Sequence, residues 1–143
     1  MLMLTPTSNV AILGFGTRAH LFAALLAPRG CALRAWDPLL ATSESVSQRA
    51  RIEAAGVDAC AELSAALRGA RLVVLDTVPG SALPEAMAAG RQVLDLGSAP
   101  AAQIDAVLEA LGLPQASGRW QAAVASHAAS EDEPAVIGRG PLP

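Results

Sequence analysis

The chain has 143 residues, of which 52% are hydrophobic and 16% are charged. This length corresponds to one ordinary domain with room for a hydrophobic core, and the low charge excludes a disordered chain. Ten basic against thirteen acidic residues give a formal net charge of −3, and no stretch gathers the basic residues. We therefore expect no nucleic-acid partner, because the electrostatic footprint of phosphate-backbone binding is missing.

The two cysteines, Cys31 and Cys60, belong to no CxxC motif and to no Cys/His cluster. This usage is typical of reduced thiols in the cytoplasm, and we expect no metal site. Residues 1–9 lack the charged start and the apolar stretch of a secretion signal. Since no apolar run approaches the roughly 20 residues of a membrane-spanning helix, we expect a cytoplasmic protein with no membrane partner.

Short apolar runs alternate along the chain with alanine-rich stretches, a pattern typical of βαβ units and a mostly parallel sheet. The runs predict six strands and, near the end, a further short one. The expected strands are 10–13, 32–36, 57–59, 72–75, 92–96, 120–124 and the short 135–137. We expect the segment from residue 130 to 134 to be a loop.

Between these strands, apolar residues recur at the spacing of an amphipathic helix. The expected helices are 17–27, 43–55, 63–67, 83–89 and 100–111. Thr17 is a plausible N-cap of the first helix, and Gly112 is the expected stop of the last. The residues expected to face the core are Ala19, Phe22, Leu25 and Leu26 on the first helix and Ile104, Val107, Leu108 and Leu111 on the last.

Right-handed crossovers turn this element order into a doubly wound Rossmann α/β fold, with strand order 3-2-1-4-5-6 and helices on both faces. Ligands bind such sheets beyond the carboxyl ends of the strands, near the reversal between strands one and four. In this topology Cys31 starts the second strand and Cys60 follows the third. Their Cα atoms are then expected to be too far apart for a disulfide.

Residues 14–19, Gly-Phe-Gly-Thr-Arg-Ala, lie between the first strand and the first helix, the context in which a GxGxxG/A match indicates a dinucleotide site. Gly14 allows the tight turn, Gly16 allows close approach of a pyrophosphate, and Ala19 allows close helix packing. The amides and the dipole at the helix N-terminus attract phosphates. The alternative is a glycine turn without a ligand. The expected cofactor-binding residues of the turn are Gly14, Phe15, Gly16, Thr17 and Arg18.

Asp37 ends the second strand 21 residues after Gly16, near the interval of about 20 at which a carboxylate receives the adenosine ribose hydroxyls. An anion there repels a 2′-phosphate, so NAD is favoured. NADP stays an alternative, because Arg18 and Arg34 could hold its phosphate. Asp37 could instead be a cap or turn residue before Pro38.

Four motifs occur in a characteristic order: residues 10–16, Trp36-Asp37, Val78-Pro79, and Asp95-Leu96-Gly97-Ser98-Ala99-Pro100. With them, almost the whole chain resembles the cofactor-binding domain of the β-hydroxyacid dehydrogenases, which include 3-hydroxyisobutyrate and 6-phosphogluconate dehydrogenases. The resemblance implies that residues 1–143 form a dinucleotide-binding domain of an oxidoreductase. Its ligands are then NAD and a small hydroxy acid.

The resemblance also implies roles for residues after the fourth and fifth strands. Val78 and Pro79 border the nicotinamide ribose in this interpretation. Ser98 lies close to the nicotinamide and the substrate, and its hydroxyl can donate a hydrogen bond to a substrate oxygen. The alternative for Ser98 is a cap of the helix that begins near Pro100.

Residues 121–127 align with the substrate-binding segment that follows strand six in this family. The family's usual Asp-Ala-Pro-Val-Ser-Gly-Gly is replaced here by Gln-Ala-Ala-Val-Ala-Ser-His, so Ser126 and His127 stand at the glycine positions. We expect these two side chains to supply substrate-binding donors, with an exposed loop histidine as the alternative for His127. His20 is expected on the surface of the first helix.

The family continues into a helical second domain that completes the substrate cleft, supplies most dimer contacts and carries the catalytic lysine. These 143 residues contain no Lys, because all ten basic residues are Arg, so catalytic residues are unknown and the isolated domain is expected to be inactive. One alternative is a non-catalytic dinucleotide-sensing module that pairs with itself as a homodimer or with another partner. Another is a methyltransferase-type domain that holds adenosylmethionine, against which the 95–100 motif argues.

Overall fold

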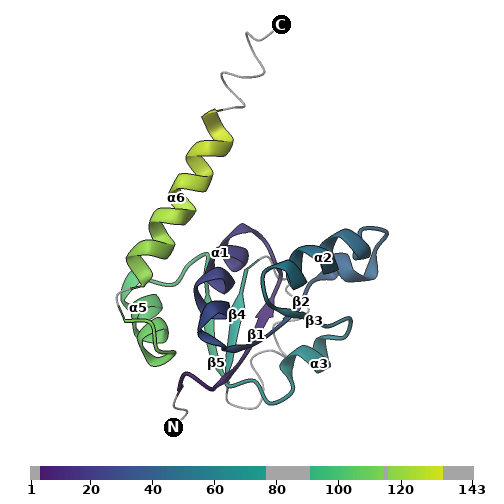
Figure 1. Cartoon of the computed structure of the whole chain (residues 1–143), viewed down its shortest axis with the longest axis horizontal. Coiled ribbons are helices and arrows are strands. Elements are labelled where there is room, and N and C mark those ends of the chain that lie inside the picture. The colour runs from purple at the N-terminus through teal and green to yellow at the C-terminus, as the bar shows by residue number, and fades with distance from the viewer. Residues whose placement is uncertain (1–3, 77–90, 115, 134–143) are drawn as a thin grey trace, which may run out of the picture.

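The computed structural model describes residues 4–76, 91–114 and 116–133. Its centre is a parallel sheet in the order β3-β2-β1-β4-β5 (Figure 1). The strands are β1 (Asn9–Leu13), β2 (Ala32–Trp36), β3 (Asp58–Ala59), β4 (Leu72–Leu75) and β5 (Gln92–Asp95). β4 is buried along its whole length, as a run of Leu and Val in a sheet covered on both faces should be.

Helices cover both faces of the sheet. They are α1 (Thr17–Leu26), α2 (Ser45–Ala54), α3 (Leu63–Leu67), α5 (Ala101–Ala110) and α6 (Ser117–Glu133), with short 3-10 helices η1 (Ala27–Arg29) and η2 (Pro38–Ala41). The chain leaves α1 through η1 and then Gly30, whose φ of 79° favours a residue without a Cβ.

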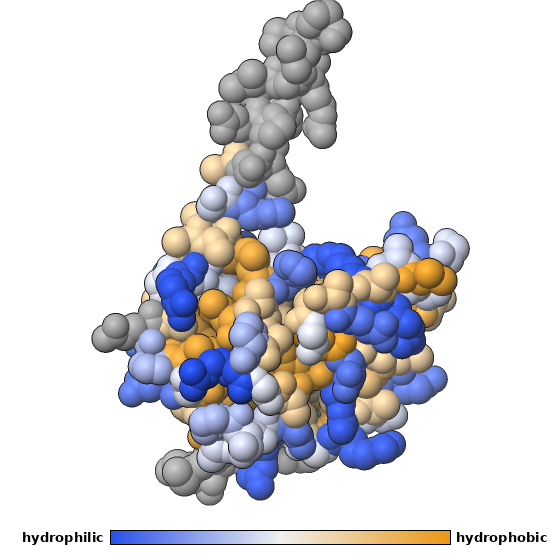
Figure 2. All heavy atoms as spheres, viewed as in Figure 1, coloured by the Kyte–Doolittle hydropathy of each residue, from blue (hydrophilic) through white to orange (hydrophobic). Residues whose placement is uncertain are grey.

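Two hydrophobic clusters of unequal size lie on the two faces. The larger cluster joins one face of the sheet to α1, α2 and α5 and also receives Trp120 from α6. The smaller cluster joins Ala11, Leu13, Val73 and Leu75 to α3. All residues expected to face the core on α1 and α5 belong to or pack against the larger cluster, which confirms both helical faces. On the side viewed in Figure 1, hydrophobic residues gather over α1 and the base of α6, with hydrophilic residues around them (Figure 2).

The predicted Rossmann fold is confirmed for five strands, but the sixth strand is wrong. Residues 120–124 lie inside α6, and the expected loop from residue 130 is helical as far as Glu133. Trp120 and Val124 are one helical turn apart and both face the larger cluster, and the alanines between them favour a helix over a strand. The expected helix 83–89 and strand 135–137 lie outside the described residues.

Cys31 and Cys60 are free thiols, as the predicted positions on β2 and after β3 required. Burial raises the pKa of both thiols above the usual value, so the reactive thiolate form is disfavoured. Within the described residues, no helix combines the length and the apolar character that a bilayer crossing requires.

Candidate functional site

The glycine turn connects β1 to α1 at the carboxyl edge of the sheet. Gly14 has a φ of 77°, a conformation that favours glycine, and its N–H donates to the carbonyl of Trp36 at 2.8 Å. The chain therefore reverses sharply, and α1 begins beside the ends of β1 and β2. This is the turn that the sequence predicted.

Asp37 lies directly against this turn. Its Oδ2 accepts a hydrogen bond from the N–H of Phe15 at 2.6 Å, and its Oδ1 accepts one from the N–H of Leu39 at 2.8 Å. The side chain is 5% exposed. Asp37 thus does two things at once. Its side chain points at the glycine turn, as a ribose-binding carboxylate would, and it also caps η2.

The carbonyl of Phe15 is held from α2. Gln48 Nε2 donates to it at 3.4 Å, and Arg51 Nη1 donates to it as well. The Arg51 guanidinium also lies over the Phe15 ring, 5.3 Å from its centroid. Neither α2 residue was expected at the turn, because a polar helix with only weak amphipathic character carries no sequence signal for a contact 33 or 36 residues away.

Asp76 follows β4 and reaches the first turn of α1. Its Oδ2 accepts a hydrogen bond from the N–H of Ala19 at 3.0 Å. A Cβ added at Gly16 would lie 2.7 Å from the same oxygen. Asp76 therefore occupies one of the helix N-terminal amides that were expected to face a phosphate.

Sequence reasoning missed Asp76 although a signal existed. β1 and β4 are neighbours, with Leu13 opposite Leu75, so an acidic residue directly after β4 lies across from the start of α1. The rule that ligands bind near this reversal of strand order applies to both loops equally.

The turn fits a dinucleotide only in part. Among the described residues, no hydrogen-bond acceptor is found for the amides of Gly16, Thr17 and Arg18, which lie at the positive end of α1. Each carboxylate oxygen of Asp37 already accepts one backbone N–H, and a carboxylate oxygen can accept a second hydrogen bond. Against this, the carboxylate of Asp76 places a negative charge beside the donors that a pyrophosphate would use.

His20 is half-buried rather than a plain surface residue. Its ring meets the ring of Phe15 edge-on, with centroids 5.9 Å apart, and its Nδ1 is buried with no hydrogen-bond partner among the described residues. Burial lowers the pKa of His20, and the nearby Arg51 and His127 lower it further. His20 is therefore disposed to stay neutral.

Ser98 lies in an exposed turn after β5, where its N–H donates to the carbonyl of Asp95 at 3.2 Å. α5 begins at Ala101 with Pro100 as the N-cap residue, so Ser98 is not the helix cap that was the alternative. Its expected contact with nicotinamide and substrate stays a prediction. Val78 and Pro79, predicted to border the nicotinamide ribose, lie outside the described residues.

Ser126 and His127 lie on the exposed surface of α6. They do not follow a sixth strand, which corrects the local structure expected for the segment 121–127. α6 runs away from the sheet (Figure 1), and His127 is close enough to His20 to affect its pKa. Their expected contact with a substrate stays a prediction.

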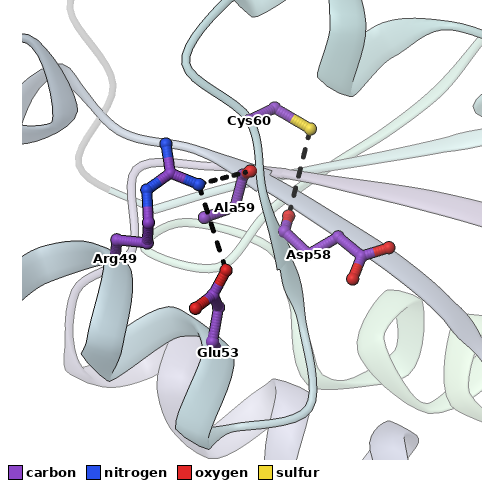
Figure 3. A network of polar contacts seen from close by, with 5 residues as sticks. All are labelled: Arg49, Glu53, Asp58, Ala59 and Cys60. Carbon is purple, nitrogen blue, oxygen red and sulfur yellow. Dashed lines mark hydrogen bonds and ion pairs between the residues drawn. The ribbon is translucent and has the colours of Figure 1, made fainter.

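A second group of polar residues lies around β3 (Figure 3). Arg49 donates to the carbonyl of Ala59 at 3.2 Å and lies 3.9 Å from Glu53. Cys60 contacts the carbonyl of Asp58 at 4.0 Å, and burial raises its pKa although Arg34 and Arg49 act in the opposite direction. These contacts attach β3 to α2 and provide no activated nucleophile. No metal-binding group of His, Cys, Asp or Glu is found in the ranges that the structure describes.

No protein-family model matches the sequence, and no curated protein matches it. Solved structures do resemble the fold. A conserved hypothetical protein from Sinorhizobium meliloti 1021 is 23% identical with a TM-score of 0.52, over 62% of this chain and 32% of that chain.

Two further structures are similar at lower scores. An imine reductase from Aspergillus terreus, solved with NADPH4, is 17% identical with a TM-score of 0.48, over 73% of this chain and 37% of that chain. The 3-hydroxyisobutyrate dehydrogenase of Mycobacterium tuberculosis, solved with L-serine, is 19% identical with a TM-score of 0.48, over 76% of this chain and 38% of that chain. This chain spans about a third of the length of the structures it matches. At such identities, the match to the Sinorhizobium protein shows a shared fold.

Proposed function

We propose that this chain is the NAD-binding domain of an oxidoreductase that acts on a small hydroxy acid. In such a reaction a hydride moves between a carbon of the hydroxy acid and the nicotinamide, while the protein supplies orientation and electrostatics. The domain would provide the cofactor half of the site, with Ser98 on the nicotinamide side. A separate structural unit would then supply the proton-transfer group, since this chain has no Lys.

One observation carries the proposal. A glycine turn opens α1, and the carboxylate at the end of the adjacent strand points at that turn, with Asp37 Oδ2 2.6 Å from the backbone nitrogen of Phe15. Amides at a helix N-terminus suit phosphates, and a carboxylate at this place suits ribose hydroxyls. The buried anion at Asp37 also supports NAD over NADP, because it would repel a 2′-phosphate.

A second candidate is a non-catalytic module that senses dinucleotides or dimerises. Asp76 favours the dimerising form of this module, because its carboxylate accepts from the N–H of Ala19 at 3.0 Å and opposes any anionic dinucleotide at the turn. A module of this kind would form a stable homodimer in solution. Measurement of its molecular mass by light scattering separates it from a monomeric cofactor domain.

Calorimetry with NADH, NADPH and adenosylmethionine, each titrated into the purified chain, tests the proposal. The expected result is binding of NADH, weaker binding of NADPH and no binding of adenosylmethionine. Failure of both dinucleotides at millimolar concentration would remove the proposal, and preferential binding of adenosylmethionine would replace it with a methyl-transfer function.

The variant Asp37→Asn tests the assigned specificity. The single amide oxygen can still accept from the N–H of Phe15, whereas the bond from the N–H of Leu39 is lost, so circular dichroism has to verify the fold. The charge that repels a 2′-phosphate is gone. We expect the preference for NADH over NADPH to fall by about tenfold, which corresponds to about 1.4 kcal/mol. An unchanged ratio of the two affinities would show that Asp37 does not face the adenosine ribose.

A further inference from the structure

We propose that Asp76 sets the affinity of the glycine turn for diphosphate ligands by competing with them for the first turn of α1. This inference rests on the proposed function, because it concerns the same cofactor site. It assigns a specificity role to a residue outside the glycine motif and outside Asp37. The ligand class concerned is any dinucleotide that carries a pyrophosphate.

The position of Asp76 supports this role. It comes from the end of β4, 57 residues after the amide that it contacts, and its Oδ2 accepts from the N–H of Ala19 at 3.0 Å. The same oxygen lies only 2.7 Å from where a Cβ of Gly16 would be. The open space over Gly16, which a pyrophosphate needs for its close approach, is therefore occupied by the protein's own carboxylate.

Because both are negatively charged, the carboxylate of Asp76 and a pyrophosphate cannot occupy the first turn of α1 together. A pyrophosphate and a carboxylate are both anions, and both are attracted by the amides and the dipole at the start of α1. They repel each other at contact distance, so a bound dinucleotide requires the side chain of Asp76 to rotate away from the N–H of Ala19. The cost of that rotation and of the remaining repulsion lowers the affinity for the dinucleotide.

The charge of Asp76 should affect the diphosphate of a dinucleotide and not its adenosine. Adenosine carries no phosphate and approaches Asp37 rather than Asp76, so its binding should not depend on the charge at residue 76. Inorganic pyrophosphate lacks the ribose and the bases, so its binding should depend on that charge. These two probes isolate Asp76 from the other contacts of the site.

The test compares the wild-type chain with Asp76→Asn and with a matched control, Asp58→Asn. Both changes remove one negative charge, but Asp58 is exposed on β3. The Asn side chain at residue 76 can still accept from the N–H of Ala19, which preserves the local structure. Binding of NADH, inorganic pyrophosphate and adenosine is measured by calorimetry, and circular dichroism verifies that each variant is folded.

The expected result is that Asp76→Asn binds NADH and pyrophosphate about tenfold more tightly than the wild type, whereas Asp58→Asn does not differ from it. Adenosine binds all three proteins equally. Equal NADH affinity of wild type and Asp76→Asn, or tighter binding by the wild type, overturns the role of Asp76 while leaving the NAD-binding function in place.

The two failures are separable. If pyrophosphate gains affinity in Asp76→Asn but NADH binds none of the proteins, the role of Asp76 holds and the proposed function falls. If neither ligand binds any of them, both fall.

Should Asp76→Asn not fold, Asp76→Ser removes the same charge. The amide resonance of Ala19 in the wild-type chain gives a second measurement. That resonance must shift on addition of pyrophosphate, and a signal that stays in place under saturating ligand overturns the proposal.

Discussion

At the scale of single residues, the glycine motif has a structural reason that does not depend on a ligand. Gly14 adopts a positive φ at the end of β1, and Gly16 leaves room for the carboxylate of Asp76. The peptide at Phe15 is fixed on its N–H by Asp37 and on its carbonyl by Gln48 and Arg51. The turn is therefore rigid before any ligand arrives.

A double-mutant cycle tests the contact between Gly16 and Asp76. We expect Gly16→Ala to lower the free energy of unfolding by about 1–3 kcal/mol, because the new Cβ lies 2.7 Å from Asp76 Oδ2 and the side chain has to move. In an Asp76→Ala background the same change should cost less. Urea denaturation of the four proteins gives the coupling energy, and a value near zero would mean that the two residues do not touch.

His20 makes a prediction about pH. Its pKa is lowered below 6.5 in the folded chain, by burial first and then by Arg51 on α2 and His127 on α6. The unfolded chain therefore binds more protons, so the contribution of His20 lowers stability as pH falls through 6.5 and restores it as pH rises again. His20→Gln should reduce the difference in melting temperature between pH 7.5 and pH 5.5.

The control for this prediction is His127→Gln, which leaves His20 in place. That variant should retain most of the pH dependence, since burial is the largest cause of the shift at His20. If His20→Gln melts with the same dependence on pH as the wild type, the ring of His20 is not buried in solution.

At the scale of elements, α6 is anchored by its first turns. Trp120 is 4% exposed, its ring meets the ring of Phe22 edge-on with centroids 6.0 Å apart, and its Nε1 donates to the carbonyl of Arg18 at 3.2 Å. Ser117 adds a hydrogen bond to Asp105 on α5. The anchor joins α6 to α1 and α5, and the remainder of the helix extends beyond the sheet (Figure 1).

Trp120→Ala tests this anchor. We expect a loss of about 3–5 kcal/mol in the free energy of unfolding, because a large buried ring is removed from the larger cluster. Trp120→Phe keeps a ring against Phe22 but loses the hydrogen bond to Arg18, so its cost should be smaller and should include about 1 kcal/mol for that bond. Urea denaturation measures both, and a loss below 1 kcal/mol in Trp120→Ala would contradict the packing described.

At the scale of the whole molecule, the order of the strands followed from the sequence because short, mainly apolar runs alternate with helical stretches and several of them lie near a glycine or proline. β2 and β4 have the predicted bounds, 32–36 and 72–75. The segment 120–124 also lies near a glycine, Gly118, and yet it is helical. Its Trp120 and Val124 suit a strand or a helix in a short window. The alanines between them favour the helix, and the packing of Trp120 against Phe22 stabilises it.

The candidate site, like the fold, was predictable from the sequence only in part. The glycine turn and Asp37 follow from local spacing, and the structure brings them together. Asp76 could have been identified from the predicted pairing of β1 with β4, although not from local spacing. Arg51 could not, because its contact with the turn depends on how α2 packs beside β1. Local motifs specify the framework of this site, whereas residues from distant segments determine its charge.

The hydrogen bond between Trp120 and Arg18 connects α6 to the first turn of α1. The helix has 17 residues, so at 1.5 Å per residue it is about 25 Å long. Near its N-terminal end, the indole ring of Trp120 packs against Phe22. The first turns of α6 are joined to the carbonyl of Arg18, two residues from Gly16. The bond of Trp120 to Arg18 therefore makes the position of α6 and the start of α1 depend on each other.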